Sequence, residues 1–340
     1  MRTTSHPGTA RLPRGTAMVR LAMLPTPAEV LAAAHRLRRV IVRTPLLRSA
    51  ALSEIAGADV YFKCENLQRT GSFKLRGAYN ALATLPADVR ARGVVASSAG
   101  NHGLGIAHSA RLLGMRARVF IPASAPVVKR DGIVALGAEV DLTQPHYDEA
   151  HEAAVAYASA NGMTFVNPCA GEPLLAGQGT VGLEILEELP GVRTIVVPVG
   201  GGGLVGGIAT LVRAVARGVH IVGAQGDRSN AMAASLDAGH RVNVDVPRTL
   251  ADGLSGQIDD EGLAIGQFAI DEMRVVTEER IGHAIAWLAR EHDFRVEGSG
   301  AVGVAAVLCA GRAAELAGPI AVVISGSNID EGRWRSIVHT

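Results

Sequence analysis

The feature that most constrains the fold is a regular alternation of short β-branched runs with longer Ala- and Leu-rich stretches. Parallel strands that are covered on both faces have this apolar character, because the crossover helices bury them. The alternation therefore predicts an α/β protein of open, doubly wound sheets with parallel strands. The clearest predicted strands are residues 93–96, 117–121, 194–199, 220–224 and 320–324.

Two prolines suggest how the chain divides into domains. Residues 90–167 form a series of strand and helix units by themselves, between Pro86 and Pro168. We therefore expect a small domain inserted into a large one. The expected limits are a small domain at 90–167 and a large cofactor-binding domain at 24–89 and 168–340.

The first ordered element is expected near Thr26. Thr26, Pro27 and Glu29 combine an N-cap, a first-turn proline and a capping box. The apolar residues that recur after it at helical spacing are Val30, Leu31, Ala34 and Leu37. We expect residues 1–23 to form a disordered tail. The alternative is a transit peptide, because the first 20 residues contain four arginines and no acidic residue.

The composition excludes several classes of function. The 33 Lys and Arg against 32 Asp and Glu leave a formal charge of +1, so no overall field favours nucleic acid or a membrane surface. No apolar run reaches the roughly 18 residues that span a bilayer. Cys64, Cys169 and Cys309 lie far apart without metal-ligand spacing, which predicts small buried side chains, no metal site and a cytoplasmic protein. The expected partner is a small molecule.

The segment Val199–Leu204 reads VGGGGL and follows an apolar predicted strand. Glycine N–H groups at the start of a helix can converge on a phosphate, and the helix dipole strengthens their attraction. One alternative is a plain tight turn. Another is a dinucleotide site, because Gly201, Gly203 and Gly206 have the spacing G-x-G-x-x-G. Gln225 counts against it, since an acidic residue should end the next strand.

Lys74 lies in TGSFKLRGAYN at residues 70–80. For most lysines, a solvated charge at a helix end is the better interpretation. Here Gly71, Ser72 and Phe73 predict a turn that presents the amine, with an aromatic ring beside a cofactor. A lysine among apolar groups loses its proton and becomes a nucleophile that can form a Schiff base.

Two more polar turns follow predicted strands. Residues 97–103, SSAGNHG, offer small residues and Asn101 as donors for a carboxylate at the start of a helix expected from about residue 104. His102 alone is more typical of a structural or capping histidine. Residues 324–328, ISGSN, bring a Ser325 hydroxyl that can bond a ring nitrogen, although an ordinary polar turn has the same composition.

In their order, these motifs resemble the pyridoxal-phosphate enzymes of the threonine dehydratase and serine racemase group, over about Pro25 to Asp330. The resemblance implies pyridoxal 5'-phosphate as cofactor and PLP fold type II, which is tryptophan synthase β-like, with two open doubly wound sheets. The matching segments are KCENLQRTGSFKLRGAYN at 63–80, SSAGNHG, AGQG at 176–179, GGGGL, TLADGL at 249–254, EGSGA at 297–301 and SGSN.

The resemblance also implies a role for each matching residue. Lys74 is implied as the catalytic Schiff-base lysine and Phe73 as its neighbour beside the cofactor ring. Asn101 is implied to bond the phenolic oxygen of the cofactor ring, and Ser325 is implied to bond its pyridine nitrogen. Glu297 resembles an acid that the family places near the ring. The implied phosphate loop is Gly200, Gly201, Gly202, Gly203 and Leu204, and the implied substrate-carboxylate loop is Ser98, Ala99, Gly100, Asn101 and His102.

Two departures from the pattern favour a dehydratase over a racemase. Serine racemases carry a second acid-base serine where this chain has Ala99, so inversion should be poor. Gln225 and Ala231 occupy the places of the racemase metal ligands, so no metal is expected.

Two other departures leave the substrate side chain open. Cys169, Ala170 and Gly171 replace an aromatic-Asp-Asp run, and the final loop reads Gly-Ser-Asn where Gly-Gly-Asn is usual.

The sequence therefore predicts a PLP-dependent ammonia-lyase that removes water and ammonia from L-threonine, L-serine or another β-hydroxy amino acid. The alternatives are an amino-acid racemase on the same scaffold, a nicotinamide-dependent oxidoreductase and a non-catalytic binding protein. We expect a homodimer or homotetramer in the cytoplasm. Because the chain ends soon after SGSN, no appended regulatory domain is expected.

Overall fold

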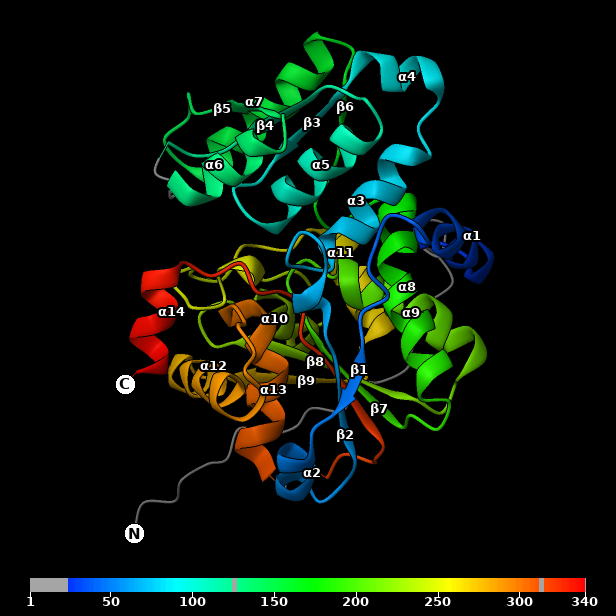
Figure 1. Cartoon of the computed structure of the whole chain (residues 1–340), viewed down its shortest axis with the longest axis vertical. Helices are drawn as coiled ribbons and strands as arrows, with labels where there is room; N and C mark the ends of the chain where they lie inside the picture. Colours follow the sequence, from blue (N-terminus) through cyan, green and yellow to red (C-terminus); the bar gives the residue numbers. More distant parts are fainter. Residues whose placement is uncertain (1–23, 124–126, 312–314, 340) are drawn as a thin grey trace.

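The computed structural model describes residues 24–123, 127–311 and 315–339, and in it two sheets lie one above the other, each covered by helices (Figure 1). The larger sheet has six strands in the order β1 (Leu46–Arg48), β2 (Val60–Lys63), β10 (Ile320–Val323), β7 (Thr194–Pro198), β8 (His220–Gly226) and β9 (Glu272–Val276). The smaller sheet has four strands in the order β5 (Glu139–Asp141), β4 (Ala117–Phe120), β3 (Val94–Ser97) and β6 (Thr164–Phe165).

All strand pairs are parallel except β1 with β2, which is antiparallel. Every strand that the sequence predicted pairs in parallel, and the antiparallel β1 was not among the predicted strands. The strands of the smaller sheet all lie between β2 and β7 in the sequence, as an inserted unit requires. The exact domain limits at residues 89/90 and 167/168 stay a prediction.

Helices cover both faces of each sheet, because alternate strand residues point to opposite faces. In β10, Ile320 and Val322 face one core cluster, and Ala321 and Val323 face the other. One face of the larger sheet packs against α2 (Ala50–Ala56), α12 (Glu278–His292) and α13 (Gly298–Ala310). The other face packs against α8 (Glu172–Glu188), α9 (Gly203–Val215), α10 (Ala231–Ala238) and α11 (Asp260–Ala269).

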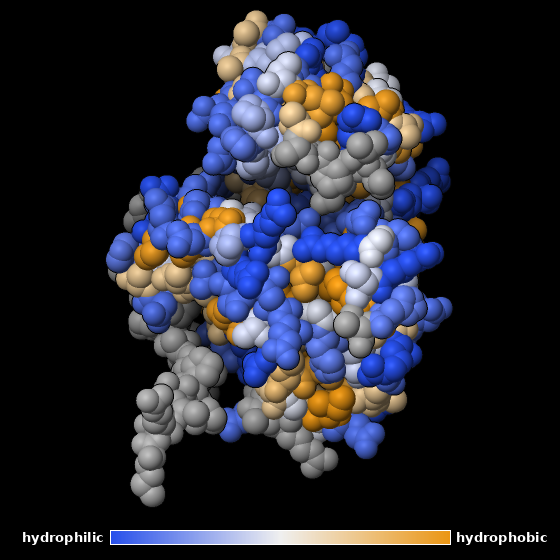
Figure 2. All heavy atoms as spheres, turned by 90° about the vertical axis from the view of Figure 1, so that its left-hand side faces the viewer, coloured by the Kyte–Doolittle hydropathy of each residue, from blue (hydrophilic) through white to orange (hydrophobic). Residues whose placement is uncertain are grey.

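The smaller sheet packs on one side against α3 (Lys74–Ala83), α5 (Asn101–Leu112) and α6 (Val127–Ala135), and on the other against α7 (Tyr147–Ala160). The remaining helices are α1 (Pro27–Leu37), α4 (Ala87–Arg92) and α14 (Glu331–Val338), with short 3-10 turns η2 (Glu65–Leu67) and η3 (Asp252–Leu254). The surface narrows between the two sheets and is mostly hydrophilic in the view of Figure 2. None of the described helices is long and apolar enough to cross a membrane.

The start of α1 confirms the predicted capping box. The Thr26 hydroxyl accepts from the Glu29 N–H at 3.3 Å, and the Glu29 carboxylate accepts from the Thr26 N–H at 2.6 Å. Of the apolar residues at helical spacing, Val30 and Leu37 are buried, whereas Leu31 is 52% exposed, and Ala33 completes the buried face. The predicted tail, residues 1–23, lies outside the described residues.

Helix α8 lies between α3 and α9, and glycines let the backbones of these helices almost touch (Figure 1). A Cβ atom on Gly177 would lie 2.5 Å from the Arg76 carbonyl oxygen of α3. A Cβ atom on Gly179 would lie 2.8 Å from the Gly207 carbonyl oxygen of α9. Only glycine permits both contacts, so α3, α8 and α9 form one tightly packed unit.

Replacing Gly177 with alanine should lower the free energy of unfolding by about 1–3 kcal/mol, because the new methyl group must push α3 away from α8. Urea unfolding followed by circular dichroism measures the change. The matched control is Gly191→Ala, where a Cβ would meet nothing within 4 Å. Equal stability of the two variants would contradict the backbone contact.

Candidate active site

Lys74 is the first residue of α3, and its side chain is directed at the segment that follows β6. Its Nζ donates to the Pro168 carbonyl oxygen at 2.6 Å and lies 5.3 Å from the centroid of the Phe73 ring. Phe73 is the N-cap residue of α3, so the amine stands at the helix start as the turn in the sequence predicted. The sequence singled out Pro168 only as a domain limit, not as a neighbour of Lys74.

The predicted phosphate loop connects β7 to α9, and the helix begins at Gly203, within the run of glycines. Gly202 is the N-cap residue with φ +95, a left-handed conformation that favours glycine. A Cβ on Gly201 would lie 2.9 Å from the Cys169 Sγ, and one on Gly203 would lie 2.7 Å from the Cys169 carbonyl oxygen. The loop therefore lies against the residue that follows Pro168, which brings it beside Lys74.

The final loop, residues 324–328, packs on the turn that precedes Lys74. The Phe73 N–H donates to the Ser325 carbonyl oxygen at 3.1 Å, and the Ser327 N–H donates to the Gly71 carbonyl oxygen at 2.8 Å. The Ser325 side chain is buried, and its hydroxyl lies 3.4 Å from the Ser299 carbonyl oxygen. Lys74 and Ser325 are thus held at one site by backbone hydrogen bonds.

Asn101 joins the smaller-sheet unit to the larger one. Its Nδ2 donates to Glu297 Oε1 at 2.7 Å, and its Oδ1 accepts from Asn328 Nδ2 at 2.6 Å. Asn328 also donates to the Thr70 carbonyl oxygen at 2.8 Å. Asn101 and Glu297, which are 196 positions apart in the sequence, are therefore in direct contact, and their roles toward the cofactor stay a prediction.

The predicted carboxylate loop ends in α5, which begins at Asn101 and not at residue 104 as expected. At this helix start, a Cβ on Gly100 would meet only the Ser98 Oγ, at 4.0 Å. The first N–H groups of a helix have no partner within the helix, so they are available to an anion.

His102 is buried within α5, and its Nε2 lies 3.0 Å from the Val166 carbonyl oxygen. Burial, and then the positive charge of Lys74, lowers the pKa of His102 to about 3. The ring is therefore neutral and links α5 to the segment after β6. Its direct role in substrate binding stays a prediction.

Pyridoxal phosphate fits the residues gathered here. Within the described part of the chain, the N–H groups of Gly200, Gly201 and Gly202 donate to no other group, and they lie at the start of α9, as a phosphate site requires. The whole sequence contains three lysines, Lys63, Lys74 and Lys129. The Lys63 ammonium is buried against Glu184 at 2.6 Å, whereas Lys74 is only partly buried and faces the site.

Three more residues belong to this region, although the sequence did not assign them a role. Cys169 was expected to be a buried apolar residue, but it is partly exposed and touches the glycine loop. Ser299 accepts from the Gly253 N–H at 2.8 Å and so holds the TLADGL segment near the glycine loop. Asn328 was visible only as the end of SGSN. Each acts through a tertiary contact that no local pattern encodes.

Gln225, at the position of a possible metal ligand, is buried and caps α10. Its Oε1 accepts from the Ala233 N–H at 2.9 Å. Within the described residues, no three His, Cys, Asp or Glu side chains are grouped as a metal site would need.

Comparison with known proteins supports the same assignment. Residues 37–326 match the family described as pyridoxal-phosphate dependent enzyme. The L-threonine ammonia-lyase of Thermotoga maritima is 44% identical over 300 residues, which cover 88% of this chain and 74% of that protein. Maize serine racemase has a TM-score of 0.87 at 30% identity, covering 93% of this chain and 97% of that one. Threonine deaminase isoform 2 of Solanum lycopersicum has a TM-score of 0.84 at 31% identity, covering 96% and 98%.

These matches confirm the expected fold type and cofactor, and they replace the dinucleotide alternative for the glycine loop. The lysine, the glycine loop and the two-sheet architecture agree with them, and the chain belongs to the family of pyridoxal-phosphate dependent enzymes.

Proposed function

We propose that this enzyme removes water and then ammonia from L-threonine or L-serine, giving a 2-oxo acid. The observation that carries the proposal is the position of the Lys74 amine, beside the glycine loop and next to the Ser325 loop. The name of the Thermotoga relative, an L-threonine ammonia-lyase, supports threonine as a substrate.

The residues that would hold the cofactor come from both sheets. Lys74 would bind its aldehyde, Gly200–Leu204 its phosphate, and Asn101 and Ser325 the two ends of its ring, with Phe73 beside the ring. Glu297 would act through Asn101, because its Oε1 accepts from the Asn101 Nδ2 at 2.7 Å and so orients the amide. When bound, pyridoxal phosphate supplies a conjugated system that stores the electron pair left after a Cα proton is removed.

The side chains of this chain would then direct the reaction. The N–H groups at the start of α5, with Ser98 to His102, bind the substrate carboxylate and so orient Cα toward Lys74. The Lys74 amine takes the Cα proton. Ser325 offers a neutral hydroxyl to the ring nitrogen. Unlike a carboxylate, this hydroxyl does not hold the nitrogen protonated. Less charge is then stored in the ring, and departure of the β-hydroxyl is favoured.

A racemase is the second candidate, and the likeness to maize serine racemase is the observation that favours it. Inversion needs an acid-base group on each side of Cα. The resemblance implies that the second group would stand at Ala99, which has no titratable atom. The side chain at this position therefore favours elimination.

We also propose that the enzyme is a cytoplasmic homodimer or homotetramer. The three cysteines are free, as is usual in a reducing compartment. Leu47 on the edge strand β1 and Leu67 in η2 are 42% and 46% exposed, which suits an interface between copies. Light scattering should give a mass of two or four times 35.2 kDa, and a monomer would contradict the proposal.

Replacing Lys74 with alanine should lower turnover of L-threonine by about 10⁴-fold, because the proton acceptor is lost. Release of 2-oxo acid measures the loss, and the absorbance of the lysine-bound cofactor should disappear with it. Lys129→Ala is the control, since it removes a lysine located in α6. Turnover that survived in Lys74→Ala would rule out this mechanism.

Replacing Ala99 with serine should raise inversion of L-serine by about a hundredfold, the effect of a positioned acid-base group. Chiral chromatography of the serine, with pyruvate measured in parallel, separates inversion from elimination. Ala99→Val is the control, because it enlarges the side chain without adding a group that titrates. No gain of inversion in the serine variant would mean that residue 99 does not face Cα.

A further inference from the structure

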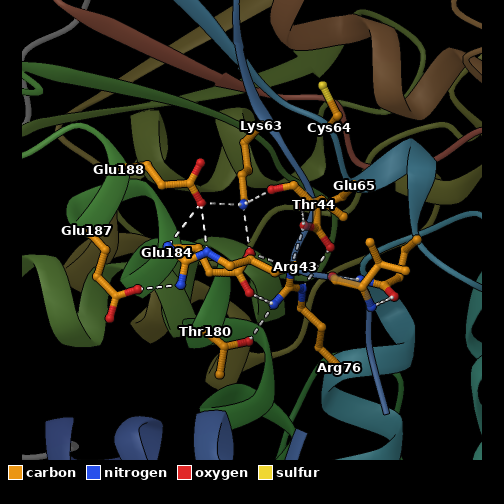
Figure 3. A network of polar contacts seen from close by, with 12 residues as sticks. Arg43, Thr44, Lys63, Cys64, Glu65, Arg76, Thr180, Glu184, Glu187 and Glu188 are labelled. Atoms are coloured by element: carbon orange, nitrogen blue, oxygen red, sulfur yellow. Dashed lines mark hydrogen bonds and ion pairs between the residues drawn. The ribbon is translucent and has the colours of Figure 1, made fainter. Parts of the chain in front are cut away.

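Four charged side chains are buried together in the interior, and we call Lys63, Glu65, Arg76 and Glu184 the Arg76 network (Figure 3). We propose that Arg76 is a positioning residue: through this network it fixes the Lys74 amine relative to the glycine loop and the Ser325 loop. The proposal rests on the role of Lys74 proposed above.

Arg76 uses its whole guanidinium group inside the protein. Its side chain has 0% exposure. The Nε and Nη2 atoms donate to Glu65 at 2.8 and 2.7 Å, and Nη1 and Nη2 donate to Glu184 at 2.7 and 2.9 Å. Nη1 also donates to the Thr180 hydroxyl at 3.0 Å. Such two-point ion pairs fix direction as well as distance.

Lys63 extends the network to the larger sheet. Its Nζ lies 2.6 Å from Glu184 Oε2 and donates to the Thr44 carbonyl oxygen at 2.5 Å. The Thr44 hydroxyl in turn donates to Glu65. Two cations and two anions are therefore buried together, and the network is electrically neutral.

Three of the four members of the network stand on segments that carry part of the site. Arg76 lies two residues after Lys74 in α3. Glu184 lies in α8, which packs through Gly179 against α9, the helix that begins at the glycine loop. Lys63 pairs with Val323 at the end of β10, and its carbonyl oxygen accepts from the Ile324 N–H at 3.0 Å, directly before Ser325.

Residues i and i+2 of a helix point to opposite sides. Lys74 accordingly points to the segment after β6, where it meets the Pro168 carbonyl, while Arg76 points to the interior. Any rotation of α3 about its axis moves both side chains at once. By holding Arg76 from two sides, Glu65 and Glu184 therefore also fix the direction of Lys74.

Stability alone does not account for this network. Buried ion pairs are often no more stabilising than apolar residues of equal volume, because desolvation offsets the attraction. Burial alone would lower the pKa of Arg76, but Glu65 and Glu184 outweigh it and raise the pKa above its usual value. Burial alone would raise the pKa of Glu184, but Arg76 and then Lys63 outweigh it and lower that pKa. Arg76 and Glu184 therefore favour their charged forms, and what their ion pairs add is a fixed geometry.

The test compares Arg76→Lys with Arg213→Lys. Lysine keeps the charge at residue 76 but cannot form the two-sided fork. Arg213, in α9, is the matched control, because it pairs with Asp271 at 2.8 Å and with two carbonyl oxygens at the amino-terminal end of the larger sheet, away from the site. Thermal unfolding of both variants shows how much stability each has lost.

For Arg76→Lys we expect kcat for L-threonine to fall by about tenfold to a hundredfold, the cost of a misplaced reacting group, with KM changed less than about threefold. Borohydride fixation of pyridoxal phosphate on Lys74, followed by peptide mass analysis, should be slower than in wild type. Hydrogen exchange should be faster in the first turn of α3 of the cofactor-free protein. Arg213→Lys should match wild type in all three measurements.

Wild-type kcat and fixation in a folded Arg76→Lys would overturn the proposal, as would equal losses in both variants. Should Arg76→Lys not fold, Thr180→Val, which removes one bond to Arg76, is expected to slow fixation in the same direction, and wild-type behaviour would overturn the proposal. If borohydride fixes the cofactor on another residue in wild type, the proposed function fails first. The two failures are therefore distinguishable.

Discussion

The close approach of α8 to its two neighbours is the constraint on which the site depends. Gly177 lets the α3 backbone lie against α8, and Gly179 does the same for α9. With no side chain between them, the separation of these helices is set by the thickness of the peptide groups. Lys74 begins α3 and Gly203 begins α9, so interior packing sets the distance between the amine and the phosphate loop.

The two sheets contribute different parts of the site. The larger sheet and its helices supply the glycine loop and Ser325, and α3, which packs between α8 and the smaller sheet, supplies the amine. Backbone contacts hold these parts together and leave little freedom. The smaller sheet supplies the start of α5. Asn101 joins the two parts through side-chain hydrogen bonds to Glu297 and Asn328, which are easier to break than a packed helix interface.

Much of this arrangement could be predicted from the sequence, because the strands, the capping box and the glycine loop are local patterns. The order of the motifs then indicated the family and the residues around Lys74. Local patterns failed where a tertiary contact decides the structure. Leu31 is at helical spacing and yet exposed, β1 pairs antiparallel, and Cys169 touches a loop more than thirty positions away in the printed sequence. The Arg76 network joins residues up to 121 positions apart, Lys63 and Glu184, so no sequence window contains it.

The small number of lysines has a chemical consequence for the assembly of the enzyme. Positive charge on this chain is carried almost entirely by guanidinium groups, which do not condense with an aldehyde under ordinary conditions. Lys63 is enclosed by carboxylates and unavailable to solvent. Free pyridoxal phosphate therefore meets few competing side-chain amines on this protein, and the chain itself directs the aldehyde to one place.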